Sequence, residues 1–234
     1  MKSMPLKKDV SVLLKKNIYY LTDETGNPKR YKPWLGDIFA FLYDKIMEKS
    51  IFPKKFKGSI NKHFEILNNE FKDIHGYNVL EIAAGSGNAV NFLNNDNKYT
   101  GIDISPGLLK IAYSKFKKYG FKDIELYNAN ANQLPFRDNT FNFAFCNLSL
   151  NFFDDIEAFL QELKRVLKSG SAFFCSVPVP ERKAADSKIR GTLYSQEELS
   201  SLFKKYNFNF ESKAYKNGAV LYFSAILTAI NKLN

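Results

Sequence analysis

Residues 79–87 are Val79-Leu80-Glu81-Ile82-Ala83-Ala84-Gly85-Ser86-Gly87, and a helix length later residues 99–103 are Tyr99-Thr100-Gly101-Ile102-Asp103. Each stretch is an apolar run that contains or ends in an acid, and the first continues into a turn of small residues. This order predicts a strand, a turn, a helix and a second, parallel strand. In such a unit a nucleotide-like ligand can approach the glycine-rich turn, and the carboxylate of Asp103 can hold ribose hydroxyls. The sequence therefore predicts a cofactor site here.

The same alternation of strand and helix continues to the end of the chain. Five strands that alternate with helices are expected near 77–82, 98–103, 123–128, 141–146 and 171–177. The helices are expected near 87–95, 106–118, 154–167 and 196–205, and Ser195 with Glu198 has the pattern of a capping box. A final hairpin is expected from strands 208–215 and 219–227. We therefore expect an α/β fold with a doubly wound, mostly parallel, seven-stranded sheet and an antiparallel C-terminal hairpin.

The first 75 residues have a different pattern, which predicts helices and irregular segments. A short helix is expected from Asp9 to Tyr20, and another from Gly36 to Ile51, with Pro53 ending it. A third is expected from Ser59 to Phe71. The interpretation is a segment of residues 1–75 that forms a helical cap and substrate roof over a core of residues 76–234.

Composition and residue spacing argue against a membrane-spanning, secreted or zinc-binding protein. The 234 residues are 45% hydrophobic, which is enough for a sizeable core, and no uncharged apolar run reaches the 18 residues of a membrane span. The N-terminus lacks the apolar segment of a signal peptide, so the cytoplasm is expected. The two cysteines and two histidines lack zinc-ligand spacing, so no metal is expected, and Cys146 and Cys175 are predicted to be buried free thiols.

The net charge of +10 raises the question of nucleic acid. Residues 1–76 carry 15 basic against 9 acidic side chains, and residues 77–234 carry 19 against 15. The charge is therefore spread without a long block of one sign, which argues against specific nucleic-acid binding.

A nicotinamide-dependent dehydrogenase is the first alternative for a glycine-rich turn after a strand. Its fingerprint needs a third small residue three positions after Gly87, and this chain has Val90 there. No Tyr-x-x-x-Lys follows the fourth strand of the core either. The dehydrogenase reading is therefore disfavoured.

Several motifs, in order and spacing, resemble the class I S-adenosylmethionine-dependent methyltransferases, most of all the branch with ubiquinone and menaquinone C-methyltransferases and small-molecule or lipid-headgroup enzymes. The motifs lie at 79–87, 101–105, 129–136, 141–153 and 163–170. The resemblance covers rather more than half of the chain. Each motif is weak alone, and their ordered combination is strong. It implies a Rossmann-like fold, S-adenosyl-L-methionine as cofactor and S-adenosyl-L-homocysteine as product.

The resemblance also implies which residues form the cofactor site. Glu81 and Gly85 to Gly87 would hold the methionine end, Asp103 the ribose, and Asn130 and Ala131 the adenine. Asn147 and Leu148 would lie beside the sulfonium and the substrate. The full set implied for the cofactor is Glu81, Ala83, Gly85, Gly87, Asp103, Ile104, Asn130, Ala131, Asn147 and Leu148.

Three positions depart from the family pattern. Ala83 replaces a usual glycine and is expected to be tolerated at negative φ. Asn130 and Asn142 replace usual aspartates. These departures leave open whether cofactor affinity and activity are reduced.

The acceptor of the methyl group is expected to be a small or lipid-like molecule. An Asn/Asp-Pro-Pro-Tyr motif, common in methyltransferases that act on base or glutamine amines, is replaced by Asn147-Leu148-Ser149-Leu150. Candidate substrate residues are Tyr31, Trp34, Tyr43 and Asn151, and no catalytic residue is assigned. An RNA methyltransferase and a non-catalytic, cofactor-binding partner module remain as alternatives, as does transient contact with a membrane surface. The sequence leaves the acceptor atom and the oligomeric state open.

Overall fold

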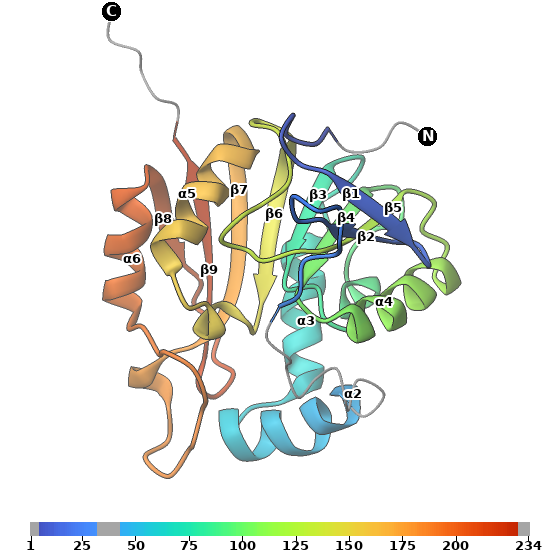
Figure 1. Cartoon of the computed structure of the whole chain (residues 1–234). Coiled ribbons are helices and arrows are strands. Elements are labelled where there is room, and N and C mark those ends of the chain that lie inside the picture. The colour runs from blue at the N-terminus through green and yellow to red at the C-terminus, as the bar shows by residue number, and fades with distance from the viewer. Residues whose placement is uncertain (1–4, 32–42, 229–234) are drawn as a thin grey trace, which may run out of the picture.

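The computed structural model describes residues 5–31 and 43–228, and their centre is one nine-stranded sheet (Figure 1). The strand order is β1-β2-β5-β4-β3-β6-β7-β9-β8. The five parallel core strands are β3 (Asn78–Ile82), β4 (Lys98–Asp103), β5 (Ile124–Asn128), β6 (Phe141–Asn147) and β7 (Leu167–Pro178). The antiparallel strands β9 (Val220–Leu227) and β8 (Phe208–Ser212) complete one edge, which confirms the expected mostly parallel sheet.

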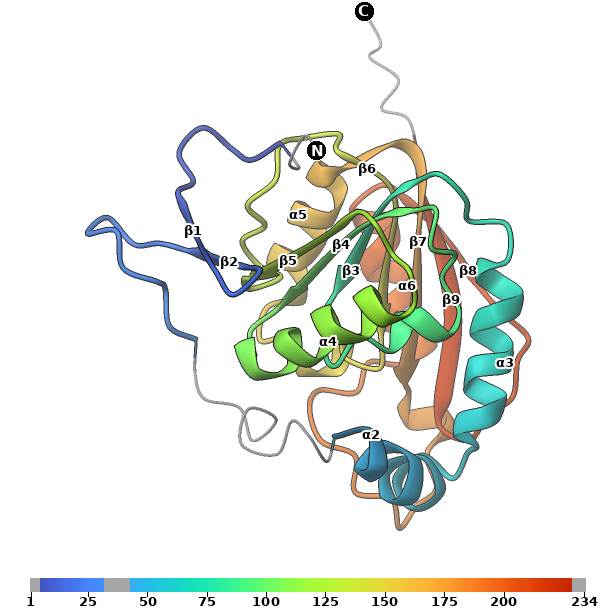
Figure 2. The ribbon, with the colours of Figure 1, turned by 90° about the vertical axis from the view of Figure 1, so that its right-hand side faces the viewer.

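Helices cover both faces of the sheet (Figure 2). On one face α5 (Ile156–Val166) and α6 (Gln196–Lys205) pack into one core cluster. On the other face α3 (Ile60–Phe71) and α4 (Pro106–Lys118) pack into the second. The expected capping box is present at Ser195, and Ser105 also caps its helix; each hydroxyl accepts a hydrogen bond from the first turn. Phe71 of α3 anchors the second cluster through edge contacts with the rings of Phe92, Phe143, Phe145 and Phe174.

The helix expected from Asp9 to Tyr20 is wrong, because this segment forms the hairpin β1 (Val12–Lys15) and β2 (Ile18–Leu21). Lys16 and Asn17 both have positive φ, as a two-residue hairpin turn requires. Tyr19 stacks on Tyr127, and β2 pairs in parallel with β5. The sheet therefore gains two strands over the expected seven at the β5 edge.

Two further helix boundaries differ from expectation. Pro53 does not end the helix before it, since α2 (Tyr43–Ile46) continues as a π-helical segment η2 (Met47–Phe56) that ends at Lys57 in the left-handed conformation. After the glycine-rich turn the chain forms only a 3₁₀ turn, η3 (Asn88–Asn91), where a helix over 87–95 was expected. Asn94 and Asn97 instead donate side-chain hydrogen bonds to backbone carbonyls, which competes with helix formation.

Candidate cofactor and substrate site

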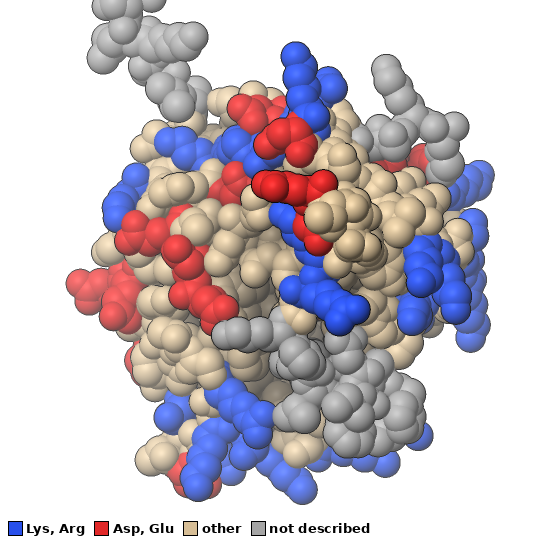
Figure 3. Space-filling view, viewed as in Figure 1, with Lys and Arg blue, Asp and Glu red and all other residues tan. Residues whose placement is uncertain are grey.

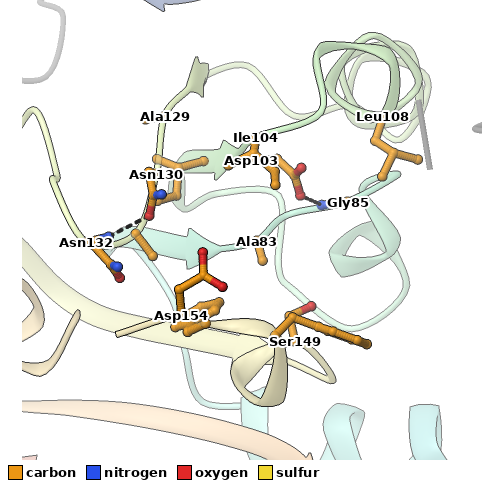
Figure 4. A pocket seen from close by; sticks show the side chains of 14 residues that line it. Ala83, Gly85, Asp103, Ile104, Leu108, Ala129, Asn130, Asn132, Ser149 and Asp154 are labelled. Carbon is orange, nitrogen blue, oxygen red and sulfur yellow. Dashed lines mark hydrogen bonds between the residues drawn. The ribbon is translucent and has the colours of Figure 1, made fainter. Parts of the chain in front are cut away.

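A pocket of about 270 Å³ lies at the carboxyl ends of β3, β4 and β5 (Figure 4). Parallel strands of an open sheet place their ligand sites at this edge. The structure brings six of the predicted residues together in its lining: Ala83, Gly85, Asp103, Ile104, Asn130 and Ala131.

Asp103 is held rigidly at the end of β4. Its Oδ2 accepts a hydrogen bond from the backbone N–H of Gly85 at 2.8 Å (Figure 4). Its Oδ1 accepts one from the N–H of Ser105 at 2.8 Å. The side chain is almost buried yet lines the pocket. Because each carboxylate oxygen has two lone pairs, the group can still accept hydrogen bonds from ligand hydroxyls.

The two glycines of the turn have different roles. Gly85 has φ +55°, and a Cβ placed on it would meet no atom nearer than 4.0 Å, so its surface is open beside the pocket. Gly87 has φ +78°, and a Cβ there would lie 2.7 Å from the Cα of Ala112 on α4. Gly87 therefore allows the turn to pack against α4, whereas Gly85 leaves room for a ligand.

Ala83 departs from its expected conformation. Its φ is +58°, so the expectation of a negative φ is wrong. A left-handed conformation at a residue with a Cβ costs about 1–2 kcal/mol. The turn therefore keeps the backbone geometry of a glycine even though alanine stands there.

Glu81 lies beneath the turn, buried and outside the pocket lining. It accepts a hydrogen bond from the hydroxyl of Tyr99, whose ring reaches along β4 over Gly101. Burial raises the pKa of Glu81 to about 8; the Tyr99 hydrogen bond opposes this rise and the charge of Asp103 adds to it. Near neutral pH the free protein therefore carries an uncharged acid under the turn.

The expected adenine end of the pocket is formed by Asn130 and its neighbours. The side-chain Oδ1 of Asn130 accepts from the N–H of Asn132 at 2.9 Å, which orders the loop after β5. Burial raises the pKa of Tyr31, and a hydrogen bond with the backbone of Asn130 opposes the rise. Tyr31, expected near the substrate, thus lies at this end of the pocket.

The helix α2, which precedes α3 in the chain, contacts the glycine-rich turn directly through hydrogen bonds. Asp44 of α2 accepts hydrogen bonds from the Ser86 hydroxyl at 2.6 Å, the Asn88 amide at 3.0 Å and the Lys115 ammonium at 2.5 Å. Burial alone would raise the pKa of Asp44, but these hydrogen bonds and the charge of Lys115 lower it overall. Trp34 and the side chain of Tyr43 lie outside the described residues.

Asn147 ends β6, and Leu148 and Asn151 come shortly after it, but none of the three lines this pocket. Asn147 is half-buried, and its Oδ1 accepts from the hydroxyl of Ser176. Leu148 turns the chain with φ +56° and donates its N–H to Ser176 O at 2.8 Å. Asn151 is buried, and its amide donates to the carbonyl of Arg190 at 2.7 Å, so it fastens the loop after β7.

Sequence reasoning missed eight lining residues: Ile102, Leu108, Ala129, Asn132, Ser149, Phe152, Phe153 and Asp154. Ser149 to Asp154 form the segment after β6, and the rule that ligands bind beyond the carboxyl ends of parallel strands was the signal available for them. Phe152 and Ile104 are large apolar side chains that stay 49% and 37% exposed at the pocket. They give it an apolar rim.

Cys146 and Cys175 are buried free thiols on neighbouring strands, as expected. Among residues 5–31 and 43–228 no group of three His, Cys, Asp or Glu side chains could hold a metal. No helix in these ranges is long and apolar enough to cross a membrane.

Comparison with known proteins matches residues 80–175 to a family described as a methyltransferase domain. A demethylmenaquinone methyltransferase from Listeria welshimeri is 32% identical over 104 residues, which are 43% of this chain and 44% of that protein. The chain therefore spans less than half of the length of this curated relative.

Two solved structures share the fold. One is an S-adenosylmethionine-dependent methyltransferase from Aquifex aeolicus, with a TM-score of 0.62 and 21% identity, covering 79% of this chain and 96% of that one. The other is phosphoethanolamine N-methyltransferase 2 from Haemonchus contortus in complex with S-adenosyl-L-methionine, with a TM-score of 0.64 and 16% identity, covering 82% and 57%. Residues 80–175 are thus similar to a methyltransferase domain, and the chain shares the fold of these two solved structures.

Proposed function

We propose that the protein transfers a methyl group from S-adenosyl-L-methionine to a small-molecule or lipid-like acceptor in the cytoplasm. The observation that carries this proposal is the hydrogen bond between Asp103 and Gly85, which joins an acid suited to a ribose to an open glycine at one pocket. The similarity of residues 80–175 to a methyltransferase domain supports the same reading.

The residues of the pocket fit this cofactor. Gly85 leaves the space that a Cβ would fill, and the carboxylate of Asp103 lines the pocket as an acceptor suited to ribose hydroxyls. Ile104 and Phe152 offer apolar surface to a flat base, with Asn130 beside them. Glu81 lies under the turn, where it could lose its proton and bind the amine of the cofactor as a carboxylate.

When bound, the cofactor supplies an electrophilic methyl group on a sulfonium. Methyl transfer by in-line displacement needs mainly the correct position of the acceptor and the exclusion of water. We propose that the acceptor lies over the ends of β6 and β7, with residues 1–75 providing part of its roof over the core of residues 76–234. Asp44 contributes by holding α2 against the turn.

Charge around this end of the molecule supports an acceptor with anionic character. Figure 3 shows lysine and arginine side chains gathered at the lower end of the molecule, where η2 and the loop after β7 lie in Figure 1. The loop contributes Lys183, Lys188 and Arg190, and η2 contributes Lys49, Lys54 and Lys55.

The test begins with titration calorimetry of S-adenosyl-L-homocysteine, for which micromolar binding is expected. Formation of this product from S-adenosyl-L-methionine is then measured with reduced demethylmenaquinone, phosphoethanolamine and total RNA as separate acceptors. Turnover with a small molecule supports the proposal. Turnover with RNA alone favours an RNA methyltransferase, and binding without turnover on any fraction favours the non-catalytic module.

A further inference from the structure

Beside the end of β6 lies a buried polar chain that the cofactor site does not use. It runs from Asn217 through Tyr222 of β9 and His63 of α3 to Asn147 of β6. The first three residues are at least 97% buried, whereas Asn147 is half-buried at the edge of the sheet. The direction of each hydrogen bond in this chain can be worked out from the backbone at its start.

The amide of Asn217 is fixed by both backbone groups of Ser59. Its Oδ1 accepts from the Ser59 N–H at 2.8 Å, and its Nδ2 donates to the Ser59 carbonyl at 3.0 Å. The second hydrogen of Nδ2 is donated to the hydroxyl oxygen of Tyr222 at 3.1 Å. The hydroxyl proton of Tyr222 must therefore point elsewhere, and Nδ1 of His63 lies 2.9 Å away.

These contacts define the tautomer of His63. Burial lowers the pKa of His63 to about 3, so the ring is neutral and carries one proton. With Nδ1 accepting from Tyr222, that proton is on Nε2. The opposite tautomer would leave the buried hydroxyl proton of Tyr222 without a partner, at a cost of about 1–3 kcal/mol.

Nε2 of His63 is buried and has no hydrogen-bond partner among the described residues, and the nearby side chain of Asn147 opposes the lowering of the His63 pKa by burial. The hydroxyl of Ser176 donates to the amide oxygen of Asn147. With Oδ1 accepting from Ser176, the amide of Asn147 has its NH₂ group on the side away from that hydroxyl. Asn147 itself is half-buried and ends β6 at the carboxyl edge of the sheet.

We propose that Asn147 is a specificity-determining residue, which donates its amide N–H to an oxygen of the methyl acceptor, while His63, Tyr222 and Ser176 are positioning residues for it. The acceptor class is a molecule with a carbonyl, phenolate or phosphoryl oxygen near the atom to be methylated. An amine that offers N–H groups at this point meets another donor and is disfavoured. This inference rests on the proposed function, since it assumes that the acceptor lies over β6.

The first experiment tests the tautomer without any ligand. With two histidines in the chain, a two-bond ¹H–¹⁵N correlation spectrum of histidine-labelled protein has two ring patterns, and a His75→Gln variant identifies that of His63. The expected pattern has the proton on Nε2 of His63. A proton on Nδ1 overturns the proposal, even if cofactor binding and turnover are both observed.

The second experiment tests the acceptor class with two probes of one shape. In protein saturated with S-adenosyl-L-homocysteine, 1-naphthol is expected to bind at least about tenfold tighter than 1-naphthylamine. Asn147→Asp, which replaces the donor by an acceptor, is expected to reverse this order. Equal binding of the probes, tighter binding of the amine, or binding of neither contradicts the proposal.

Variants of His63 separate positioning from folding. His63→Gln keeps an N–H donor near the place of Nε2, and His63→Leu removes it. The glutamine variant is expected to retain the naphthol preference and the leucine variant to lose it, with both cooperatively folded. A preference that survives in a folded leucine variant counts against the positioning role. Failure of the homocysteine product to bind wild-type protein would instead reject the proposed function and leave the tautomer result standing.

Discussion

Oδ2 of Asp103 lies 2.8 Å from the backbone nitrogen of Gly85, so the acid of one strand holds the turn that follows its neighbour. The pair joins β4 to the segment after β3 across the pocket edge. Any change at Asp103 therefore acts on the ribose contact and on the turn at once, and variants that preserve shape are the informative ones.

Asp103→Asn keeps the shape of the side chain but removes its charge. Loss of charge-assisted hydrogen bonds is expected to weaken binding of S-adenosyl-L-homocysteine by about 2 kcal/mol, or roughly thirtyfold. Titration calorimetry measures this, with the exposed Asp73→Asn as matched control. Unchanged affinity in the Asp103 variant would remove this residue from the site.

Substitutions at the two turn glycines are expected to have different effects, mainly on stability at Gly87 and mainly on cofactor binding at Gly85. Gly87→Ala places a Cβ 2.7 Å from the backbone of Ala112 and should lower the free energy of unfolding by roughly 2–4 kcal/mol. Gly85→Ala has open space and should cost about 1 kcal/mol through its positive φ, while its methyl group reduces cofactor affinity at least about tenfold. Urea unfolding and calorimetry on both variants test this; the reverse assignment of the two effects would show that Gly85 does not face the ligand.

Ala83→Gly is expected to stabilise the protein by up to about 1 kcal/mol. Relief of the left-handed strain at φ +58° exceeds the entropy that glycine adds to the unfolded chain. The same substitution at Ala158 in α5, where the backbone is helical, should instead destabilise by about 0.5–1 kcal/mol. Urea unfolding of both variants decides, and a loss of stability in Ala83→Gly contradicts the strain.

Glu81, with its pKa near 8, is expected to lose a proton when the positively charged amine of the cofactor arrives. Affinity should therefore rise with pH between about 6 and 8, and calorimetry in buffers of different ionisation enthalpy should detect proton release. A raised pKa in the folded state also means that stability falls as pH rises from the ordinary value of about 4.5 towards 8. Glu81→Gln should remove both effects; a variant with unchanged proton release would place its source elsewhere.

Asp44 is expected to hold α2 and η2 on the turn. Asp44→Asn should reduce protection of residues 43–56 in hydrogen exchange, with a loss of about 1 kcal/mol or less because the pair with Lys115 is partly exposed. Since the folded pKa of Asp44 is lowered, its contribution is complete above about pH 4 and is lost as pH falls through the folded value. Glu48→Gln, on the same helical segment, is the control, and equal loss of protection in both would refute the anchor.

Apart from the helix expected over 87–95, strand and helix positions from residue 77 onwards were predictable because the apolar runs that form β3 to β7 are bounded by caps and turns. The N-terminal hairpin was not, because its strands are four residues long and their decisive contact, Tyr19 on Tyr127, is more than 100 residues away. A positive φ at Ala83 likewise results from the turn as a whole and not from alanine.

In the site, the glycine-rich motif predicted where the pocket lies but not which side chains form hydrogen bonds with one another there. Asp103, Gly85 and Asn130 lie at the pocket as expected. The hydroxyl of Tyr99 donates a hydrogen bond to the carboxylate of Glu81. The Tyr99 side chain can reach this position only because Gly101 lacks a side chain. Pairings of this kind depend on register between strands, which a single sequence does not display.

The hairpin β1–β2 has a consequence for any shortened form of the protein. It covers β5, whose free backbone groups would otherwise be open to pairing with a second molecule. A fragment limited to residues 80–175, or one that lacks the residues before 22, would expose the unpaired backbone groups of β5. This edge lies beside β4, the strand that ends in Asp103. Self-association of such fragments should not be taken as the behaviour of the intact chain.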